Sequence, residues 1–291
     1  MRARKTKLIL LAVTLLLAIA GATQFNHSPV SPHESLVIRR FDVSAGSSNS
    51  RSDNSVLRVG TFNIHGGKGR DGRRDLERTA ACLEDLDVVA LNEVRGDWFN
   101  WRPDQAAELG RILKMDSMFV PTEQIGWFDR FGNGLLSRLE LTNVVRIPLP
   151  GTQRKRFRNA ALTSFLWNDR VIHLLAVHID STRDRSQQLE IVCELFLSLD
   201  EPALLMGDLN TRADDPMLQR LLAARGVVDV LAAKGSLDRR AGSHIDWILA
   251  RGLTPVSAEL RDDGASDHPF VRAELVPIQR MKARLIQDEA D

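Results

Sequence analysis

The chain has 291 residues, enough for one large domain or two small ones. Hydrophobic residues make up 43% and charged residues 26%, and the formal net charge is +1, as in an ordinary globular protein. Residues 1–55 hold seven Lys or Arg against three Asp or Glu, a net +4, so the remaining 32 basic and 35 acidic residues give −3. These numbers exclude a basic body that would hold nucleic acid by overall charge alone.

The N-terminus has the pattern of a targeting segment. The basic sequence MRARKTK precedes 15 uncharged residues, Leu8 to Ala22, which end in Ala-Gly-Ala. Residues 1–22 predict a secretory signal peptide, or an uncleaved membrane anchor through residues 8–22, although this run is shorter than the ~20 residues of a spanning helix. Both interpretations export the rest of the chain, which would be periplasmic, secreted or anchored to the outer side of the cytoplasmic membrane.

Three regions follow the targeting segment. Residues 23–55 are rich in Ser, Asn, Pro and Gly, which predicts a flexible linker with a short strand at Leu36–Phe41. Residues 56–276 predict the folded domain, and residues 277–291 predict a charged C-terminal tail. Cys82 and Cys193 lie in helix-like patterns, which is more typical of two buried thiols than of a disulfide, but their pairing stays open.

The domain pattern contains two β-α-β units. The first comprises a strand at residues 57–64, a helix at 75–86 and a strand at 87–94. The second comprises a strand at 171–178, a helix at 186–199 and a strand that ends in Gly-Asp-Leu-Asn at 207–210. Further predicted elements are helices at 103–114 and 216–225, and strands at 118–120, 133–137, 159–167, 243–249 and from 265 onward.

Polar residues follow the ends of these strands. Because the carboxyl ends of neighbouring parallel strands meet at one edge of a sheet, we expect the polar residues to gather at one rim. Their carboxylate and amide oxygens favour Mg²⁺, Mn²⁺ or Ca²⁺, and the chain has no cysteine cluster or His-Glu-x-x-His pattern for zinc. The residues at this expected rim are Asn63, Glu93, His178, Asp208, Asn210, Asp246, Asp267 and His268.

Six motifs carry a resemblance to a known family. They are Phe62-Asn63, LNEVR (91–95), AVHID (176–180), GDLNTR (207–212), IDWIL (245–249) and SDH (266–268). In order and spacing they resemble the endonuclease/exonuclease/phosphatase superfamily, which includes deoxyribonuclease I, exonuclease III, neutral sphingomyelinases and inositol polyphosphate 5-phosphatases. The resemblance spans about residues 56–275. It implies a four-layer α/β sandwich, with two packed mixed β-sheets flanked by helices, and a metal-dependent phosphoester hydrolase.

The resemblance also implies a division of roles. Glu93 would be the principal metal ligand with help from Asn63, and Asp267 the C-terminal metal-side acid, with Mg²⁺ (or Mn²⁺ or Ca²⁺) as the ion. Among the predicted catalytic residues, Asp208 would orient or deprotonate the attacking water, and Asn210 would hold the phosphate or a metal. His178 would donate to a phosphate oxygen, and His268 would contact the phosphate or nucleophile while paired with Asp246.

Four residues are predicted to bind phosphate. Arg95 matches an arginine near the phosphate in deoxyribonuclease-like members. The chain has no tyrosine, and Asn133 takes about the place of the active-site tyrosine motif of exonuclease III-like members. Arg158 or Asn159, which follow the basic stretch 154–156, could reach a phosphate, although a solvated basic loop is the alternative interpretation.

Two protonation states are expected from this assignment. A carboxylate at Asp246 should raise the pKa of His268 and fix its tautomer. Asp208, close to a metal and an imidazolium, should stay ionised.

Three functions fit the sequence. The first is an exported, divalent-metal-dependent phosphodiesterase or nuclease. The second is a membrane-associated hydrolase of phospholipids or small phosphoesters, similar to sphingomyelinases or phosphoinositide phosphatases. The third, an inactive binding module, is disfavoured because all the expected polar residues are present. The expected partner is therefore a phosphodiester or phosphomonoester, from nucleic acid or a lipid headgroup, and no obligate protein partner is expected.

Overall fold

The computed structural model describes residues 2–26, 35–38, 55–96, 103–123, 131–151, 157–235 and 244–278. Most of the expected linker, the basic stretch 154–156 and the tail beyond residue 278 lie outside these residues.

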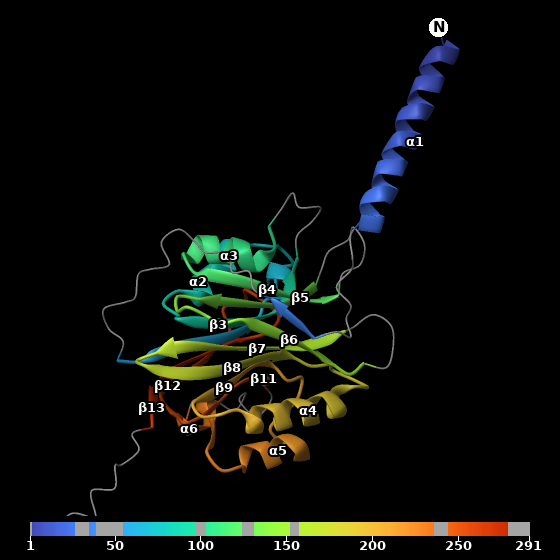
Figure 1. Ribbon diagram of the computed structural model, residues 1–291. Coiled ribbons are helices and arrows are strands. Elements are labelled where there is room, and N and C mark those ends of the chain that lie inside the picture. Colours follow the sequence, from blue (N-terminus) through green and yellow to red (C-terminus); the bar gives the residue numbers. More distant parts are fainter. Residues whose placement is uncertain are drawn as a thin grey trace, which may run out of the picture.

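Two mixed β-sheets pack face to face, with helices on their outer faces (Figure 1). The seven-stranded sheet has the order β1 (Leu36–Ile38), β6 (Val144–Leu149), β7 (Arg158–Trp167), β8 (Arg170–His178), β9 (Ala203–Asp208), β11 (Asp246–Arg251) and β10 (Val227–Asp229). The six-stranded sheet has the order β12 (Leu253–Arg261), β13 (Phe270–Pro277), β2 (Leu57–Asn63), β3 (Val88–Arg95), β5 (Phe131–Ser137) and β4 (Asp116–Glu123). The predicted four-layer sandwich is confirmed.

The helices form the two outer layers. α2 (Leu76–Leu83) and α3 (Gln105–Leu113) cover the six-stranded sheet, and α4 (Arg185–Ser198) and α5 (Pro216–Leu222) cover the seven-stranded sheet (Figure 1). Shorter helices are η1 (His65–Gly67) and α6 (Val230–Ala233). Three apolar cores result, one between the sheets and one under each helical layer. The helical layers and the packing of one sheet on the other therefore bury both faces of each sheet, as parallel strands require.

Two parallel strand pairs set the position of the site. β2 pairs with β3 so that Asn63 lies opposite Asn92, and β8 pairs with β9 so that His178 lies opposite Asp208. Both predicted β-α-β units are thus present. Because each pair ends at its polar residues, the carboxyl ends of the four strands deliver these side chains to one rim of the sandwich.

The sequence did not predict β6, β12 or the three-residue strand β10. β6 contains Pro148 and β12 contains Pro255, and a proline within a strand pattern argues against a central strand. β12 tolerates Pro255 because it is an edge strand with a register shift between Pro255 and Ser257. The last predicted strand began at residue 265, whereas β13 begins at Phe270 because residues 265–269 form a polar loop.

The N-terminal part forms a helix and a short strand. α1 (Arg2–Asn26) lies apart from the two sheets, and many of its apolar side chains are exposed (Figure 1). No helix within the described residues has the length and apolar character needed to cross a membrane. The short strand predicted in the linker is present as β1, which pairs antiparallel with β6 and adds an edge to the domain. Cys82 and Cys193 are both free and buried.

The core between the sheets should dominate stability. We expect Leu204→Ala to lower the free energy of unfolding by about 2–5 kcal/mol, because Leu204 is fully buried there and its removal leaves a cavity. Urea denaturation followed by circular dichroism measures the change. Leu197→Ala is the control, since Leu197 on α4 is 40% exposed. Equal midpoints for the two variants would contradict this account of the core.

Candidate active site

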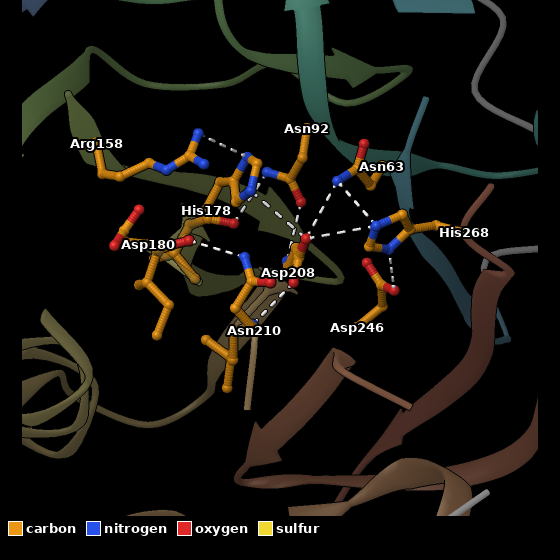
Figure 2. A network of polar contacts seen from close by, with 12 residues as sticks. Asn63, Asn92, Arg158, His178, Asp180, Asp208, Asn210, Asp246 and His268 are labelled. Atoms are coloured by element: carbon orange, nitrogen blue, oxygen red, sulfur yellow. Dashed lines mark hydrogen bonds and ion pairs between the residues drawn. The ribbon is translucent and has the colours of Figure 1, made fainter. Parts of the chain in front are cut away.

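Asp208 lies at the centre of the polar rim, and it is 1% exposed (Figure 2). One oxygen, Oδ2, accepts from Asn63 Nδ2 at 3.1 Å and lies 3.5 Å from His178 Nε2 and 3.9 Å from His268 Nε2. The other oxygen, Oδ1, accepts from the backbone N–H of Asn210 at 2.8 Å. Asn63 reaches it from β2 and His178 from β8, so both sheets contribute to a single buried carboxylate.

The backbone before Asp208 explains how it reaches this position. Gly207 has φ 142°, and a Cβ there would lie 1.9 Å from the carbonyl oxygen of Val177. Only glycine permits this close approach of β9 to β8. The glycine in the Gly-Asp-Leu-Asn sequence thus sets the strand spacing that carries Asp208 to the rim.

Asp246 and His268 form the predicted acid–histidine pair. Asp246 Oδ2 lies 2.7 Å from His268 Nδ1, and Asp246 is fully buried. Burial alone would lower the pKa of His268, but the hydrogen bond and charge of Asp246 outweigh it and raise that pKa to about 9. The expected direction of this shift is confirmed, and His268 is a cation at neutral pH.

His178 has the opposite character. Burial, then the charge of Arg158, then the charge of His268 hold the pKa of His178 well below its usual value, so the ring is neutral. Arg158 Nη1 lies 3.4 Å from His178 Nδ1, and an arginine can only donate. This network assigns the proton of the neutral ring to Nε2, which faces Asp208. The 3.5 Å contact between His178 Nε2 and Asp208 Oδ2 therefore joins a neutral ring to the carboxyl group and is not an ion pair.

The expectation that Asp208 stays ionised assumed a bound metal ion, and in the metal-free protein the pKa of Asp208 is raised. Burial and the charge of Asp246 raise the pKa of Asp208 to about 7, although the charge of His268 and hydrogen bonds from Asn210 and Asn63 act against the shift. The sequence indicated that a cationic histidine would stabilise the Asp208 carboxylate. It did not indicate how deeply Asp208 is buried, and burial destabilises the charged form of the carboxyl group.

The predicted metal ligands lie on the β2–β3 side of the rim. Glu93 lies within a register shift of β3 between Leu91 and Val94 and has φ 58°. Within the described residues no hydrogen bond or ion pair involves its half-buried carboxylate. Asn63 Oδ1 accepts from the backbone N–H of His65 at 3.2 Å. Asp267 Oδ1 lies 3.3 Å from His65 Nδ1 and accepts from Ser266 at 3.1 Å. Of the two carboxylates, that of Asp267 has partners in His65 and Ser266, whereas that of Glu93 has none within the described residues.

A second set of donor atoms lies nearby. One ligand atom from each of Asp208, Asp246 and His268 falls within 4.8 Å of the other two. We favour the Glu93 side for a cation, because Asp246 and His268 are already joined by the 2.7 Å hydrogen bond and His268 is positively charged.

Three of the seven non-glycine residues with positive φ in the described part of the chain lie at the rim. Glu93, Asn210 and His65 all have positive φ, at 58°, 44° and 48°. Such conformations are uncommon for residues other than glycine and cluster at functional sites. At Asn210 this conformation lets Nδ2 donate to the carbonyl oxygen of Ile179 at 2.9 Å, so the predicted catalytic amide is tied to the loop after β8.

The four predicted phosphate-binding residues divide into two groups. Arg158 reaches the rim through His178, and Arg95 lies along the η1 turn, where a Cβ on Gly66 would come within 2.6 Å of Arg95 Nε. Asn133 and Asn159 are buried between the sheets instead, and Asn133 Nδ2 donates to Asn159 Oδ1 at 2.9 Å. These contacts do not support phosphate binding by the two asparagines, and that role stays a prediction.

The two asparagines belong to a chain of buried amides that sequence reasoning missed. Its key member is Asn92, which accepts from the backbone N–H of Asp208 and donates to Val177 O and to Asn133 Oδ1, each at 2.9 Å. The chain ends where Asn159 Nδ2 donates to the carbonyl oxygen of Pro121 at 2.8 Å. An asparagine inside the apolar run VVALNEV was the available signal, since a buried polar group needs partners.

Asp180 was also not predicted as a site residue. It lies beside Arg158 (Figure 2), and it accepts from the backbone N–H and the hydroxyl of Thr182 at 3.0 and 2.9 Å. Burial alone would raise the pKa of Asp180, but the hydrogen bonds of Thr182, with help from the charge of Arg158, lower it. Asp180 therefore supplies a negative charge next to the cation that neighbours His178.

Comparison with known proteins agrees with this fold. The sequence profile of the Endonuclease/Exonuclease/phosphatase family matches residues 60–268. An endonuclease/exonuclease/phosphatase from Beutenbergia cavernae superposes with a TM-score of 0.63 at 25% identity, covering 77% of this chain and 72% of its own. A family protein from Leptotrichia buccalis (TM-score 0.62, 16% identity, 76% and 99% covered) and D. rerio TDP2 complexed with single strand DNA product (0.56, 22%, 76% and 99%) share the fold. No curated protein matches the sequence.

The Asp246–His268 pair predicts a measurable titration. In nuclear magnetic resonance of the metal-free protein, we expect the His268 ring to titrate near pH 9, and Asp246→Asn to move its pKa down because the charge that raises it is lost. Since folding raises this pKa, the pair stabilises the fold fully below about pH 6.5 and the contribution is lost as pH rises through about 9. An unchanged His268 pKa in the variant would contradict the assignment.

Asn92 should position Asp208. We expect Asn92→Ala to lower the free energy of unfolding by about 1–3 kcal/mol, because buried groups of Asp208, Val177 and Asn133 lose their partner. It should also move the amide resonance of Asp208 and speed its hydrogen exchange. Asn143→Ala, at an exposed loop position, is the control. A stable variant with an unchanged Asp208 amide would show that Asn92 does not hold this strand end.

Proposed function

Because this chain belongs to the endonuclease/exonuclease/phosphatase family, a family of phosphoester hydrolases, we propose that it is a divalent-metal-dependent phosphodiesterase that acts on nucleic acid. The observation that carries the proposal is the buried Asp208 between a neutral histidine and a cationic histidine. In such a site the carboxylate can accept a proton from water, and the two histidines can stabilise the negative charge of the transition state.

The residues on the β2–β3 side fit a hard cation. Glu93 presents a carboxylate with no protein partner within the described residues, and Asn63 and Asp267 add amide and carboxylate oxygens nearby. Oxygen donors of this kind suit Mg²⁺, Mn²⁺ or Ca²⁺. Glu93, Asn63 and Asp267 would hold the ion, which when bound would supply positive charge to phosphate oxygens.

Asp208 is suited to handle the attacking water. Its Oδ2 lies at the meeting point of Asn63, His178 and His268, and a pKa near 7 matches a base that works near neutral pH. We assign Asp208 the role of orienting the water and accepting its proton. Asn210, whose N–H donates to Asp208, holds the carboxylate in place.

The two histidines are suited to different parts of the reaction. Phosphoryl transfer spreads negative charge over the non-bridging oxygens and the leaving oxygen. His268 is a cation held by Asp246, so its positive charge can stabilise the negative charge of the phosphate. His178, neutral with its proton on Nε2, donates a hydrogen bond without being able to act as a strong acid. Arg158 and Arg95 add positive charge around this position.

Support for nucleic acid as the substrate comes from a structural relative. D. rerio TDP2 is complexed with single strand DNA product, and it shares the fold of this chain. We propose the same class of substrate here. Export is a separate proposal, and it depends on the basic start and the 15 uncharged residues of the N-terminus.

Hydrolysis by the purified full-length chain tests the proposal. The substrates are single-stranded and duplex DNA, RNA, bis-p-nitrophenyl phosphate, sphingomyelin and a phosphoinositide, each with Mg²⁺, Mn²⁺, Ca²⁺ or a chelator. We expect metal-dependent cleavage of nucleic acid and of the small diester. Glu93→Gln and Asp208→Asn should each lower kcat/KM by at least about 100-fold, because they remove charge that acts in the transition state.

The matched control is Glu190→Gln, an exposed position on α4, which should keep full activity. Full activity of Glu93→Gln would remove the metal-binding role assigned to Glu93. Preferential hydrolysis of sphingomyelin or the phosphoinositide would replace nucleic acid by a lipid headgroup. A folded protein that hydrolyses none of the substrates would contradict the proposed function.

A further inference from the structure

A compact basic loop follows β2. Residues 68–74, here the 68–74 loop, carry four cations in seven positions: Lys68, Arg70, Arg73 and Arg74. Lys68 and Arg74 pair as an antiparallel bridge, and Gly69 N–H donates to Arg73 O at 2.9 Å. Gly72, with φ 78°, closes the turn with a 2.9 Å hydrogen bond to Gly69 O. The loop is thus a hydrogen-bonded hairpin with a defined conformation.

The 68–74 loop lies next to the candidate active site. It starts five residues after Asn63, and the backbone N–H of Arg70 donates to Gly264 O at 3.1 Å. Gly264 begins the segment that carries Asp267 and His268. His65, between Asn63 and the loop, contacts Asp267 at 3.3 Å. A substrate with its reacting phosphate beside His268 would therefore have the 68–74 loop on its flank.

The carboxylates near the 68–74 loop already take part in hydrogen bonds or ion pairs. Asp71 accepts from Arg78 at 2.9 Å, and these hydrogen bonds with help from the backbone of Arg73 lower the pKa of Asp71 to about 2. Asp75 caps α2 by accepting from the backbone N–H of Arg78 at 3.1 Å. Asp262 pairs with Arg70 at 2.7 Å. The acidic groups of the region therefore have partners of their own.

Among the described residues, three cations of the loop lack an ion-pair partner, although the charge of Arg73 helps to lower the pKa of Asp71. Within the part of the chain that the structure describes, no ion pair joins Lys68, Arg73 or Arg74 to a carboxylate. Arg73 and Arg74 are exposed, and Lys68 is half-buried with its stem near Gly72. Residues 56–291 carry a net charge of −3, so this group is a local excess of positive charge on an acidic domain.

The loop fits a strand of phosphates better than a lipid surface. A membrane-binding surface combines cations with exposed apolar side chains that enter the bilayer. Residues 65–75 contain no large apolar side chain. Cations alone, on a loop that continues from the reacting centre, are the pattern that binds a phosphate backbone.

We propose that the 68–74 loop binds the backbone of a nucleic-acid strand on the flank of the scissile phosphate, with Lys68, Arg73 and Arg74 as the contacts. This proposal rests on the proposed function and extends it. The loop makes the enzyme prefer a polymer over a small diester, since a small diester cannot reach beyond the reacting centre.

A charge-reversal variant, Lys68→Glu/Arg73→Glu/Arg74→Glu, tests the proposal. Fluorescence anisotropy measures the binding of a labelled single-stranded 20-mer to the full-length chain in chelator, from 50 to 200 mM salt. We expect affinity at 50 mM to fall at least tenfold. We also expect the slope of log affinity against log salt to become shallower by about 2, because about three phosphate contacts are lost. The ratio of kcat/KM for the 20-mer to that for bis-p-nitrophenyl phosphate should fall by at least tenfold.

The control variant makes the same change of charge elsewhere. Arg170→Glu/Arg220→Glu/Arg225→Glu alters exposed cations near the starts of β8 and β10, away from the rim where β8 ends at His178. It should bind the 20-mer with the affinity and salt slope of the unaltered chain. An equal loss in the control would overturn the proposal, because overall charge would then explain the effect.

Two further results would contradict the proposal. The first is unchanged 20-mer binding by the loop variant. The second is loss of binding to phosphatidylglycerol vesicles by that variant without loss of 20-mer binding, which would assign the loop to a membrane surface. Failure of the proposed function is distinguishable, because it appears as no hydrolysis of bis-p-nitrophenyl phosphate by the unaltered chain, whereas the anisotropy assay needs no turnover.

Discussion

The burial of one carboxylate, Asp208, is the constraint on which the rest of the site depends. A charged group removed from water is costly unless hydrogen bonds and opposite charge surround it. Asn63 and the N–H of Asn210 supply the hydrogen bonds, and His268 supplies the charge. These groups come from β2, from the loop after β9 and from the loop before β13, so the sandwich has to bring both sheets to one point. The pKa near 7 shows that compensation is incomplete, which leaves Asp208 able to exchange a proton near neutral pH.

Two histidines flank this carboxylate, and their second partners give them opposite character. His268 has the carboxylate of Asp246 behind it, and its pKa rises to about 9. His178 has Arg158 behind it, and its pKa falls well below the usual value. One ring is thus a cation and the other a neutral donor, although they lie 3.9 and 3.5 Å from the same oxygen. Identical residue types acquire separate roles because of the charge on the far side of each ring.

The sequence predicted the fold and most of the rim because both depend on local patterns. Strand ends followed by Asn63, Glu93, His178 and Asp208 are visible in the order of residues, and parallel pairing then brings them together. The amide chain through Asn92, Asn133 and Asn159 could not be found this way, since its partners come from strands on different sheets. The same limit applies to Asp208, whose ionisation in the metal-free protein depends on how deeply neighbouring strands bury it. β6 and β12 were missed because their prolines suggest a break in a strand, and only the edge position of β12 shows why Pro255 is tolerated there.

The buried amides tie the packing of the sheets to the geometry of the rim. Asn92 belongs to β3 of one sheet, yet it holds the N–H of Asp208 in β9 and the carbonyl oxygen of Val177 in β8 of the other. An apolar contact in this place would resist separation of the sheets but not a small slide between them, because apolar packing is not directional. Hydrogen bonds of 2.9 Å are directional, so they fix the register in which Asn63 on β2 meets Asp208 on β9. The position of the Asp208 carboxylate is therefore fixed by hydrogen bonds of asparagines that lie buried between the sheets and do not reach the rim.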